Sequence, residues 1–149
     1  MPLVFTYGPD TVQGRMYDRI GPSEMVGTGT LHGYRLVFDK PNMKNKAEGL
    51  PNLQEDAEGS AFGLLFELTP KQFEMLDGFF GGYERKVFDV TLNDEDNPIK
   101  RPARTWVARR KKASLKASQA NLDLYKQGLE ENGAPEAFLQ GVESYEVMK

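Results

Sequence analysis

Phe62-Gly63-Leu64-Leu65-Phe66-Glu67-Leu68-Thr69-Pro70 is the stretch that predicts most about the fold. Its first seven residues are almost all apolar, which is typical of a β-strand buried on both faces. Thr69 and Pro70 then favour a helix start, because Thr is a common N-cap and Pro a common first helical residue. We therefore expect a buried strand followed directly by a short helix, whose inner face is formed by Phe73, Leu76 and the ring of Phe79 or Phe80.

A second apolar run, Leu3 to Tyr7, lies near the N-terminus and is ended by Gly8-Pro9-Asp10. Because it is apolar throughout, we expect this strand to be paired on both sides. Residues 25–39 follow with an alternating, glycine-punctuated pattern typical of strands. Residues 40–60 are rich in Lys, Asn, Gly, Pro and Glu, and predict a long polar loop.

The C-terminal half alternates first and becomes helical later. Residues 87–92 and 103–108 predict a hairpin with a polar turn over 93–98. Two helices are expected at the end of the chain, over 121–131 and 135–144. Many strands and few helices predict an α+β fold: a mixed, barrel-like curved β-sheet with a short helix after a central strand and two C-terminal helices. We expect residues 1–149 to form one domain.

The composition narrows the chemistry that the chain can perform. Its 149 residues are 39% hydrophobic and 28% charged, as in ordinary globular proteins. The sequence has no cysteine, which excludes a disulfide framework, a thiolate metal site and a catalytic thiol. The one histidine, His32, lies between two strand-like segments and is interpreted as a surface residue. We therefore expect no metal site and no cofactor, and look for chemistry in carboxylates, hydroxyls and the backbone.

The charge pattern does not indicate a nucleic-acid or membrane partner. The formal net charge is −3. A run of four basic residues follows the last predicted strand, and we interpret it, together with three basic residues nearby, as a solvated loop. No apolar stretch approaches the roughly 18 residues needed to span a bilayer, and the N-terminus lacks the basic segment of a signal peptide. We expect a soluble, cytoplasmic protein, and the sequence predicts no oligomeric state. The basic residues in question are Arg101, Arg104, Arg109, Arg110, Lys111, Lys112 and Lys116.

Two glycine-containing segments are candidates for a ligand site. A strand that runs into Gly8 can expose successive backbone N–H groups, which suit a carboxylate or an amide; an ordinary Gly-Pro turn is the alternative. The segment 76–85 carries Gly78, Gly81 and Gly82. These glycines either let the backbone approach a ligand closely or simply end the helix and turn the chain.

Six short motifs follow one another in a fixed order along the chain. They are Phe5 to Asp10, Gly33 to Leu36, Gly49 to Leu53, Gly63 to Leu68, Leu76 to Gly81 followed by Tyr83 and Arg85, and Tyr125 to Phe138. In these motifs, and over nearly its full length, the chain resembles the γ-glutamylcyclotransferases and γ-glutamylamine cyclotransferases. The resemblance implies the α+β fold given above and a reaction that needs no metal or cofactor.

The resemblance also implies a reaction and a site. In this family the α-amine of a small γ-glutamyl compound attacks its own side-chain carbonyl, which releases 5-oxoproline and an amine or amino acid. Backbone amides of the first loop hold the glutamyl group and suit the oxyanion that develops on the carbonyl. We expect the pocket where residues 7–10 meet residues 78–83, partly covered by residues 40–60. The implied substrate-binding residues are Tyr7, Gly8, Pro9, Asp10, Gly81 and Tyr83.

One residue departs from the family pattern at the position that carries the chemistry. The family glutamate, which takes a proton from the amine and passes one to the leaving group, is replaced by Phe80. Three interpretations stay open. The chain is a silent or repurposed relative that binds or converts another small molecule; or another carboxylate replaces the glutamate; or Phe80 is a deliberate substitution. The candidate carboxylates are Asp10, Asp77, Glu84 and Glu58.

Overall fold

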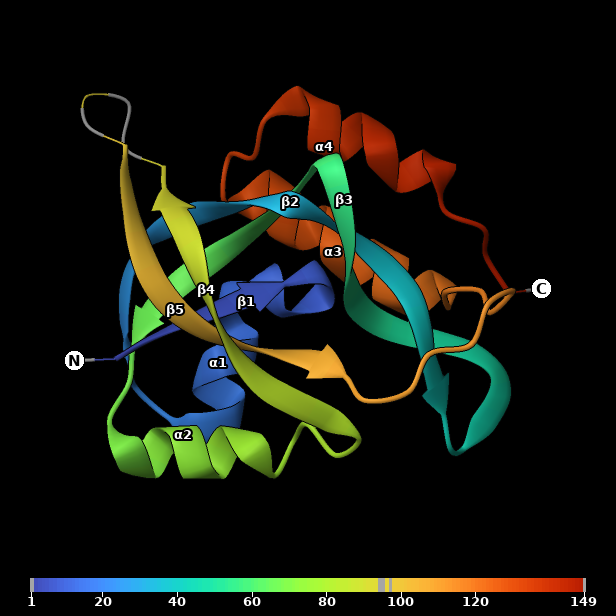
Figure 1. Ribbon diagram of the computed structural model, residues 1–149, viewed down its shortest axis with the longest axis horizontal. Helices are drawn as coiled ribbons and strands as arrows, with labels where there is room; N and C mark the ends of the chain where they lie inside the picture. Colours follow the sequence, from blue (N-terminus) through green and yellow to red (C-terminus); the bar gives the residue numbers. More distant parts are fainter. Residues whose placement is uncertain (1, 94–95, 97, 149) are drawn as a thin grey trace.

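The computed structural model describes residues 2–93, 96 and 98–148, and its strands close into a barrel in the order β1-β3-β2-β4-β5 (Figure 1). Neighbouring strands are antiparallel, except that β1 and β5 run parallel where the barrel closes. This mixed barrel with helices outside it confirms the predicted α+β class. The strands are β1 (Leu3–Tyr7), β2 (Glu24–Asn42), β3 (Asn45–Glu67), β4 (Tyr83–Leu92) and β5 (Ile99–Ala108).

The first strand is paired on both sides, by β3 and by β5, as its apolar sequence predicts. Successive side chains of a strand point to opposite faces of the sheet. Leu3 and Phe5 belong to one cluster of buried residues, whereas Val4 belongs to a second cluster that includes Met16 of α1 (Gln13–Ile20) and Phe73 of α2 (Pro70–Asp77). Because both faces of β1 are covered, both faces are apolar.

The prediction of a long loop over residues 40–60 is wrong. Residues 24–42 and 45–67 form one long antiparallel hairpin, in which Lys40 pairs with Leu50 and Pro41 with Gly49. Shifts of register between Phe38 and Lys40, and between Pro41 and Asn42, bend the β2 strand. Residues 43–47 at its tip are exposed. The polar composition therefore reflects the hairpin's exposure to solvent, and the register shifts hide the alternation expected of a strand.

The helix predicted after the buried strand is α2 (Pro70–Asp77). Its N-terminus has a capping box, in which the Thr69 hydroxyl accepts from the Gln72 N–H at 3.2 Å and the Gln72 side chain accepts from the Thr69 N–H at 3.0 Å. Phe73 and Leu76 are buried, as predicted. Phe80 lies three residues beyond the end of the helix and packs against the same buried cluster as Phe73 and Leu76, whereas Phe79 is exposed.

The remaining helices cover the outside of the barrel. Figure 1 shows α3 and α4 on one side of the barrel and α2 on the opposite side. The two predicted C-terminal helices correspond to α3 and to α4 with the 3-10 turn that follows it, whereas α1 was not predicted. Bounds are α1 (Gln13–Ile20), α3 (Gln119–Glu131) and α4 (Glu136–Gly141), with 3-10 turns η1 (Gly8–Thr11) and η2 (Val142–Ser144).

In the part of the chain that the structure describes, no helix combines the length and the apolar character needed to cross a membrane.

The predicted hairpin is formed by β4 and β5, which pair from Tyr83 with Ala108 to Leu92 with Ile99. Its predicted turn over 93–98 includes residues 94, 95 and 97, which lie outside the described residues.

Candidate functional site

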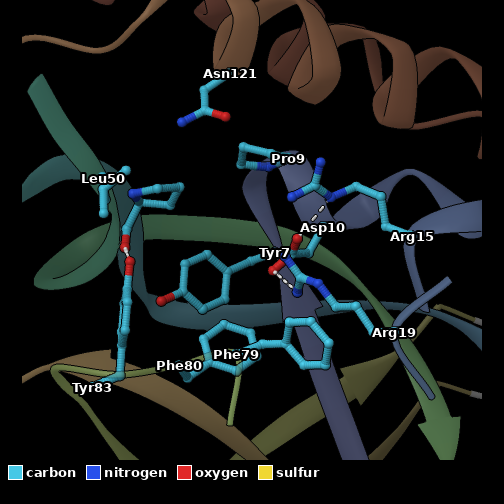
Figure 2. A pocket seen from close by; sticks show the side chains of 11 residues that line it. Tyr7, Pro9, Asp10, Arg15, Arg19, Leu50, Phe79, Phe80, Tyr83 and Asn121 are labelled. Atoms are coloured by element: carbon cyan, nitrogen blue, oxygen red, sulfur yellow. Dashed lines mark hydrogen bonds and ion pairs between the residues drawn. The ribbon is translucent and has the colours of Figure 1, made fainter. Parts of the chain in front are cut away.

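A cavity of about 190 Å³ opens at the end of β1 (Figure 2). Its walls come from β1, the turn η1, α1, the middle of β3, the turn after α2 and the start of α3. Figure 2 shows the rings of Tyr7, Phe80 and Tyr83 gathered on one side, with Asp10 and two arginines on the other. The lining residues are Tyr7, Pro9, Asp10, Arg15, Arg19, Leu50, Pro51, Phe79, Phe80, Tyr83 and Asn121.

The turn after β1 is a 3-10 turn and not an ordinary β-turn. Gly8 has φ +63°, and a Cβ there would lie 3.3 Å from Leu36 Cδ1, so both conformation and space favour glycine. The Thr11 hydroxyl donates to the Gly8 carbonyl at 2.7 Å, and Asn132 donates to the Thr11 carbonyl at 2.8 Å. The turn is therefore held from inside and by the end of α3. Pro9 adds no N–H donor to it.

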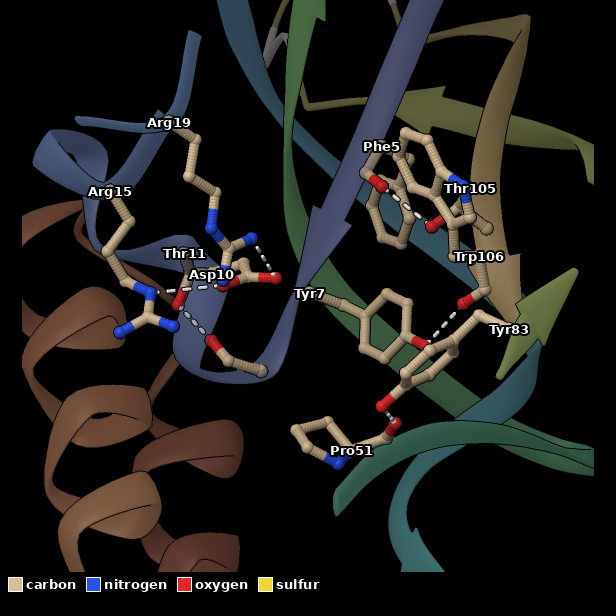
Figure 3. Close-up of polar contacts among 11 residues, drawn as sticks. Phe5, Tyr7, Asp10, Thr11, Arg15, Arg19, Pro51, Tyr83, Thr105 and Trp106 are labelled. Atoms are coloured by element: carbon tan, nitrogen blue, oxygen red, sulfur yellow. Dashed lines mark hydrogen bonds and ion pairs between the residues drawn. The ribbon is translucent and has the colours of Figure 1, made fainter. Parts of the chain in front are cut away.

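Asp10 is held by two arginines (Figure 3). Arg15 Nε lies 3.0 Å from Asp10 Oδ1, and Arg19 Nη1 lies 3.1 Å from Oδ2. Both carboxylate oxygens thus have a partner, whereas each guanidinium keeps further N–H groups, because arginine has five donors. Two positive charges against one negative charge give this wall of the cavity an excess of positive charge.

The helix α1 brings these arginines to the cavity. Arg15 and Arg19 are four residues apart and so share one helix face. Met16 and Ile20 have the same spacing and are buried on another face. The sequence indicates this helix through two pairs of residues with a spacing of four, Arg15 with Arg19 and Met16 with Ile20. Gly14 and the polar residues around it, which are poor indicators of a helix, obscured it.

Aromatic side chains form the opposite wall. Phe80 stacks on Trp106 with ring centroids 4.4 Å apart and planes 5° apart, and its centroid lies 5.5 Å from that of Tyr83 in an edge-on arrangement. The guanidinium carbon of Arg19 lies 5.4 Å from the ring centroids of both Phe79 and Phe80. Phe80 is therefore fixed between an indole and a cation, in a position typical of packing and not of proton transfer.

Two tyrosine hydroxyls are oriented by backbone carbonyls (Figure 3). Tyr7 donates to the Trp106 carbonyl at 2.6 Å, and Tyr83 donates to the Pro51 carbonyl at 2.7 Å. Burial, followed by the nearby negative charge of Asp10, raises the pKa of Tyr83. Burial also raises the pKa of Tyr7 well above its ordinary value. Both hydroxyls thus stay protonated, with their hydrogens engaged, and offer lone pairs as acceptors.

The structure brings together five residues expected at the site from the sequence: Tyr7, Pro9, Asp10, Phe80 and Tyr83. Gly8 is buried in the turn behind them, and Gly81 lines a neighbouring cavity.

Three of the candidate carboxylates do not line the cavity. Asp77 accepts from Trp106 Nε1 at 2.9 Å and lies 3.6 Å from Arg85 Nη1. Glu58 and Glu84 are exposed on β3 and β4. The lining residues that were not predicted as site residues are Arg15, Arg19, Leu50, Pro51, Phe79 and Asn121. Leu50 and Pro51 belong to residues 40–60, the segment expected to cover the pocket in part, and they do so as part of a hairpin strand and not of a loop.

A metal site needs several ligating side chains close together. Across residues 2–93, 96 and 98–148, the structure places no group of three or more His, Cys, Asp or Glu side chains where a metal ion could be held.

The chain thus belongs to the class of α+β proteins that have a closed mixed barrel, here with a small cavity at the end of the first strand. Within that class, the chain belongs to the family described as "Gamma-glutamyl cyclotransferase, AIG2-like", whose family model matches residues 4–128. The resemblance found in the sequence motifs is thereby confirmed. A search of the curated proteins finds no match.

Solved structures share the fold at low sequence identity. A structure named γ-glutamyl cyclotransferase is 17% identical with a TM-score of 0.87, and the match covers 99% of this chain and 89% of that one. An uncharacterised protein from Homo sapiens is 18% identical with a TM-score of 0.85, over 99% and 89% of the two chains. YkqA from Bacillus subtilis is 19% identical with a TM-score of 0.77, over 99% of this chain and 56% of that one.

Proposed function

We propose that the chain binds a small γ-glutamyl compound in this cavity and cyclises its γ-glutamyl group to 5-oxoproline, with Asp10 as the proton carrier. The observation that carries the proposal is that Asp10 is the one carboxylate among the described residues lining the cavity. Membership of the cyclotransferase family supports the type of reaction. A cavity of about 190 Å³ suits a ligand smaller than the drug-sized ones that occupy roughly 300–1,000 Å³.

The charges and acceptors of the cavity match the two ends of an amino acid. The unpaired N–H groups of Arg15 and Arg19 suit the α-carboxylate of the substrate, because guanidinium groups bind carboxylates strongly. The hydroxyl oxygens of Tyr7 and Tyr83 suit its α-ammonium group as acceptors. If the substrate carboxylate displaces Asp10 from one arginine, one oxygen of Asp10 loses its partner. Substrate binding therefore makes Asp10 available to accept a proton.

The proposed reaction balances without any other reactant. The α-ammonium group gives one proton to Asp10, and the resulting amine attacks the γ-carbonyl carbon. A new C–N bond forms, and the old amide C–N bond breaks. One proton of the ammonium stays on the ring nitrogen, and two reach the leaving nitrogen through Asp10, so that the product amine leaves protonated. Holding amine and carbonyl in an attacking geometry supplies much of the rate.

Binding without turnover is a second candidate, and two observations favour it. Both oxygens of Asp10 are paired with arginines. Phe80, which the sequence motif aligns with the family glutamate, lies in a face-to-face stack with Trp106. In this case the cavity retains a γ-glutamyl compound or a related small amide and does not convert it.

Release of 5-oxoproline from a set of γ-glutamyl dipeptides and amines tests the proposal, with binding followed in parallel by calorimetry. Asp10→Asn keeps the shape of the side chain and removes its proton-accepting ability, so turnover should fall by about 10²–10⁴-fold. Glu84→Gln is the control, because Glu84 is another candidate carboxylate that is exposed on β4 and does not line the cavity, and it should retain turnover.

The outcomes separate the candidates. Product formation that Asp10→Asn leaves unchanged would exclude Asp10 as the proton carrier. Binding by the natural sequence with no detectable 5-oxoproline would favour the retained ligand over the reaction. If the chain shows no binding and forms no product, both candidates are overturned.

A further inference from the structure

A second cavity, of about 270 Å³, lies on the other side of the turn that follows α2. Three basic side chains line it, together with apolar surface from a proline and a methionine. Its lining residues are Lys40, Pro41, Met43, Gly81, Gly82, Arg109 and Arg110.

The two cavities share their walls. Lys40 lines the second cavity, and its partner across the hairpin, Leu50, lines the first. Phe80 lines the first cavity, and the next residue, Gly81, lines the second. A Cβ built on Gly81 would meet no atom within 4 Å apart from its chain neighbours, so the space beside Gly81 is open. A ligand longer than a γ-glutamyl group therefore has room to extend from the first cavity along Gly81 toward the second.

Arg109 and Arg110 come from the end of β5, where the backbone holds them against the turn. The Arg109 N–H donates to the Gly82 carbonyl at 3.0 Å. Neither arginine forms an ion pair with a described carboxylate. Both are exposed and free to turn toward a ligand. Residues 109–112 are exposed, as expected of a solvated loop, but Arg109 and Arg110 also face a cavity. The prediction of a loop is wrong for Arg101 and Arg104, which belong to β5.

Lys40 is the buried member of this group, with 8% of its surface exposed. Its Nζ donates to the Pro41 carbonyl at 3.2 Å and lies 5.1 Å from the centroid of the Tyr83 ring. An ammonium group has three donors, and no carboxylate of the described residues pairs with this one. Burial lowers the pKa of Lys40. A buried cation without an anion is costly, and a bound anion would offset that cost.

We propose that this second cavity is a subsite for an oxyanion, a carboxylate or a phosphoryl group, carried by the half of the substrate that leaves as an amine. This inference rests on the proposed function and deepens it, because it states which leaving groups the site prefers. Pro41 and Met43 supply apolar contact for the carbon chain that joins the two charged ends. A leaving group that ends in an ammonium ion would face three cations and bind poorly.

Four γ-glutamyl amides of equal chain length test the subsite; they end in a carboxylate, a phosphonate, a methyl group and an ammonium group. Dissociation constants are measured by calorimetry at low and high salt. We expect the two anionic ends to bind about tenfold more tightly than the ammonium end, because several weak ion pairs add together. The difference should shrink at high salt, and the ratio of the two anionic arms tells which oxyanion fits better.

The double variant Arg109→Ala/Arg110→Ala should reduce this preference severalfold, since only Lys40 of the three cations remains, and should leave the methyl-ended compound unaffected. Lys111→Ala/Lys112→Ala removes the same charge from the same loop outside the cavity, and should keep the preference. Equal affinity for all four ends, or equal effects of the two double variants, would overturn the subsite while the proposed function stands. Failure of all four compounds to bind would overturn the subsite and the proposed function together.

Discussion

The ring of Phe80 lies flat on the indole of Trp106, with centroids 4.4 Å apart. Trp106 is itself fixed at two points, because its Nε1 donates to Asp77 at 2.9 Å and its carbonyl accepts from Tyr7 at 2.6 Å. This arrangement joins the end of α2, the end of β1 and β5 at one place. Phe80, the residue that the sequence motif aligns with the family glutamate, is therefore part of the structural support of the cavity.

Introduced into the Asp10→Asn variant, which lacks its proton carrier, Phe80→Glu should raise the rate of 5-oxoproline release by about 10²–10⁴-fold, the usual contribution of a general base. The new carboxylate would take the place of a ring that lies 5.4 Å from the Arg19 guanidinium carbon. The lost stack should cost about 0.5–1.5 kcal/mol of stability, measured by urea unfolding. Phe80→Gln is the control, since it has the same size as glutamate and cannot accept a proton. Equal rates for the two variants would contradict the prediction.

The sequence predicts the parts of the fold that local chemistry determines. The apolar residues of β1 and the Thr69-Pro70 start of α2 lie where the pattern places them, because burial and capping act locally. The hairpin over residues 40–60 was missed, since its strands are held by cross-strand pairing such as Lys40 with Leu50. Pairing between distant residues leaves little trace in composition.

The same limit applies to the candidate site. The motifs located Tyr7, Asp10, Phe80 and Tyr83, which line the cavity. The sequence could not choose among the carboxylates, because Asp77 is directed toward Trp106 only by the packing of the end of α2 against β5. Because α1 was not predicted, its arginines were not expected beside Asp10.

Asn52→Leu should lower the free energy of unfolding by about 1–3 kcal/mol, the usual cost of leaving buried polar groups without partners. Asn52 is 1% exposed, donates to Asp39 at 2.8 Å and accepts from the Ala108 N–H at 2.8 Å. Leucine can make neither hydrogen bond. Gln127→Leu, on the exposed face of α3, should change stability by no more than about 0.5 kcal/mol. Urea unfolding measures both, and equal effects would contradict a structural role for Asn52.

Stability should fall as the pH rises above about 10, because several tyrosines are buried in their neutral form. Burial raises the pKa of Tyr145 to about 12, and it also raises the pKa of Tyr7, Tyr83 and Tyr125. A raised pKa means that the unfolded chain loses these protons first, so stability is complete below the unfolded pKa and is lost as the pH rises toward the folded one.

Urea unfolding at a series of pH values from 8 to 12 measures this loss. Tyr145→Phe should reduce the slope between about pH 10 and 12, although it also removes the hydrogen bond to the Leu36 carbonyl at 2.7 Å. That lost bond should lower stability by about 1 kcal/mol at pH 8. A slope that stays the same in the variant would show that Tyr145 ionises equally in both states.

Gly128→Ala should destabilise the protein by about 1–3 kcal/mol, because the helix α3 lies too close to the turn η1 for a methyl group. A Cβ on Gly128 would collide with Thr11 Oγ1 and lie 2.7 Å from the Thr11 carbonyl carbon. The turn that would have to move is the one that places Asp10 in the cavity, so ligand affinity should fall together with stability. Gly14→Ala is the matched control, since Gly14 is also helical and a Cβ there meets nothing within 4 Å. It should stabilise the protein by about 0.5–1 kcal/mol through helix propensity. Thermal unfolding with and without a γ-glutamyl ligand compares the two variants, and a Gly128→Ala protein as stable as Gly14→Ala would show that the turn yields without cost.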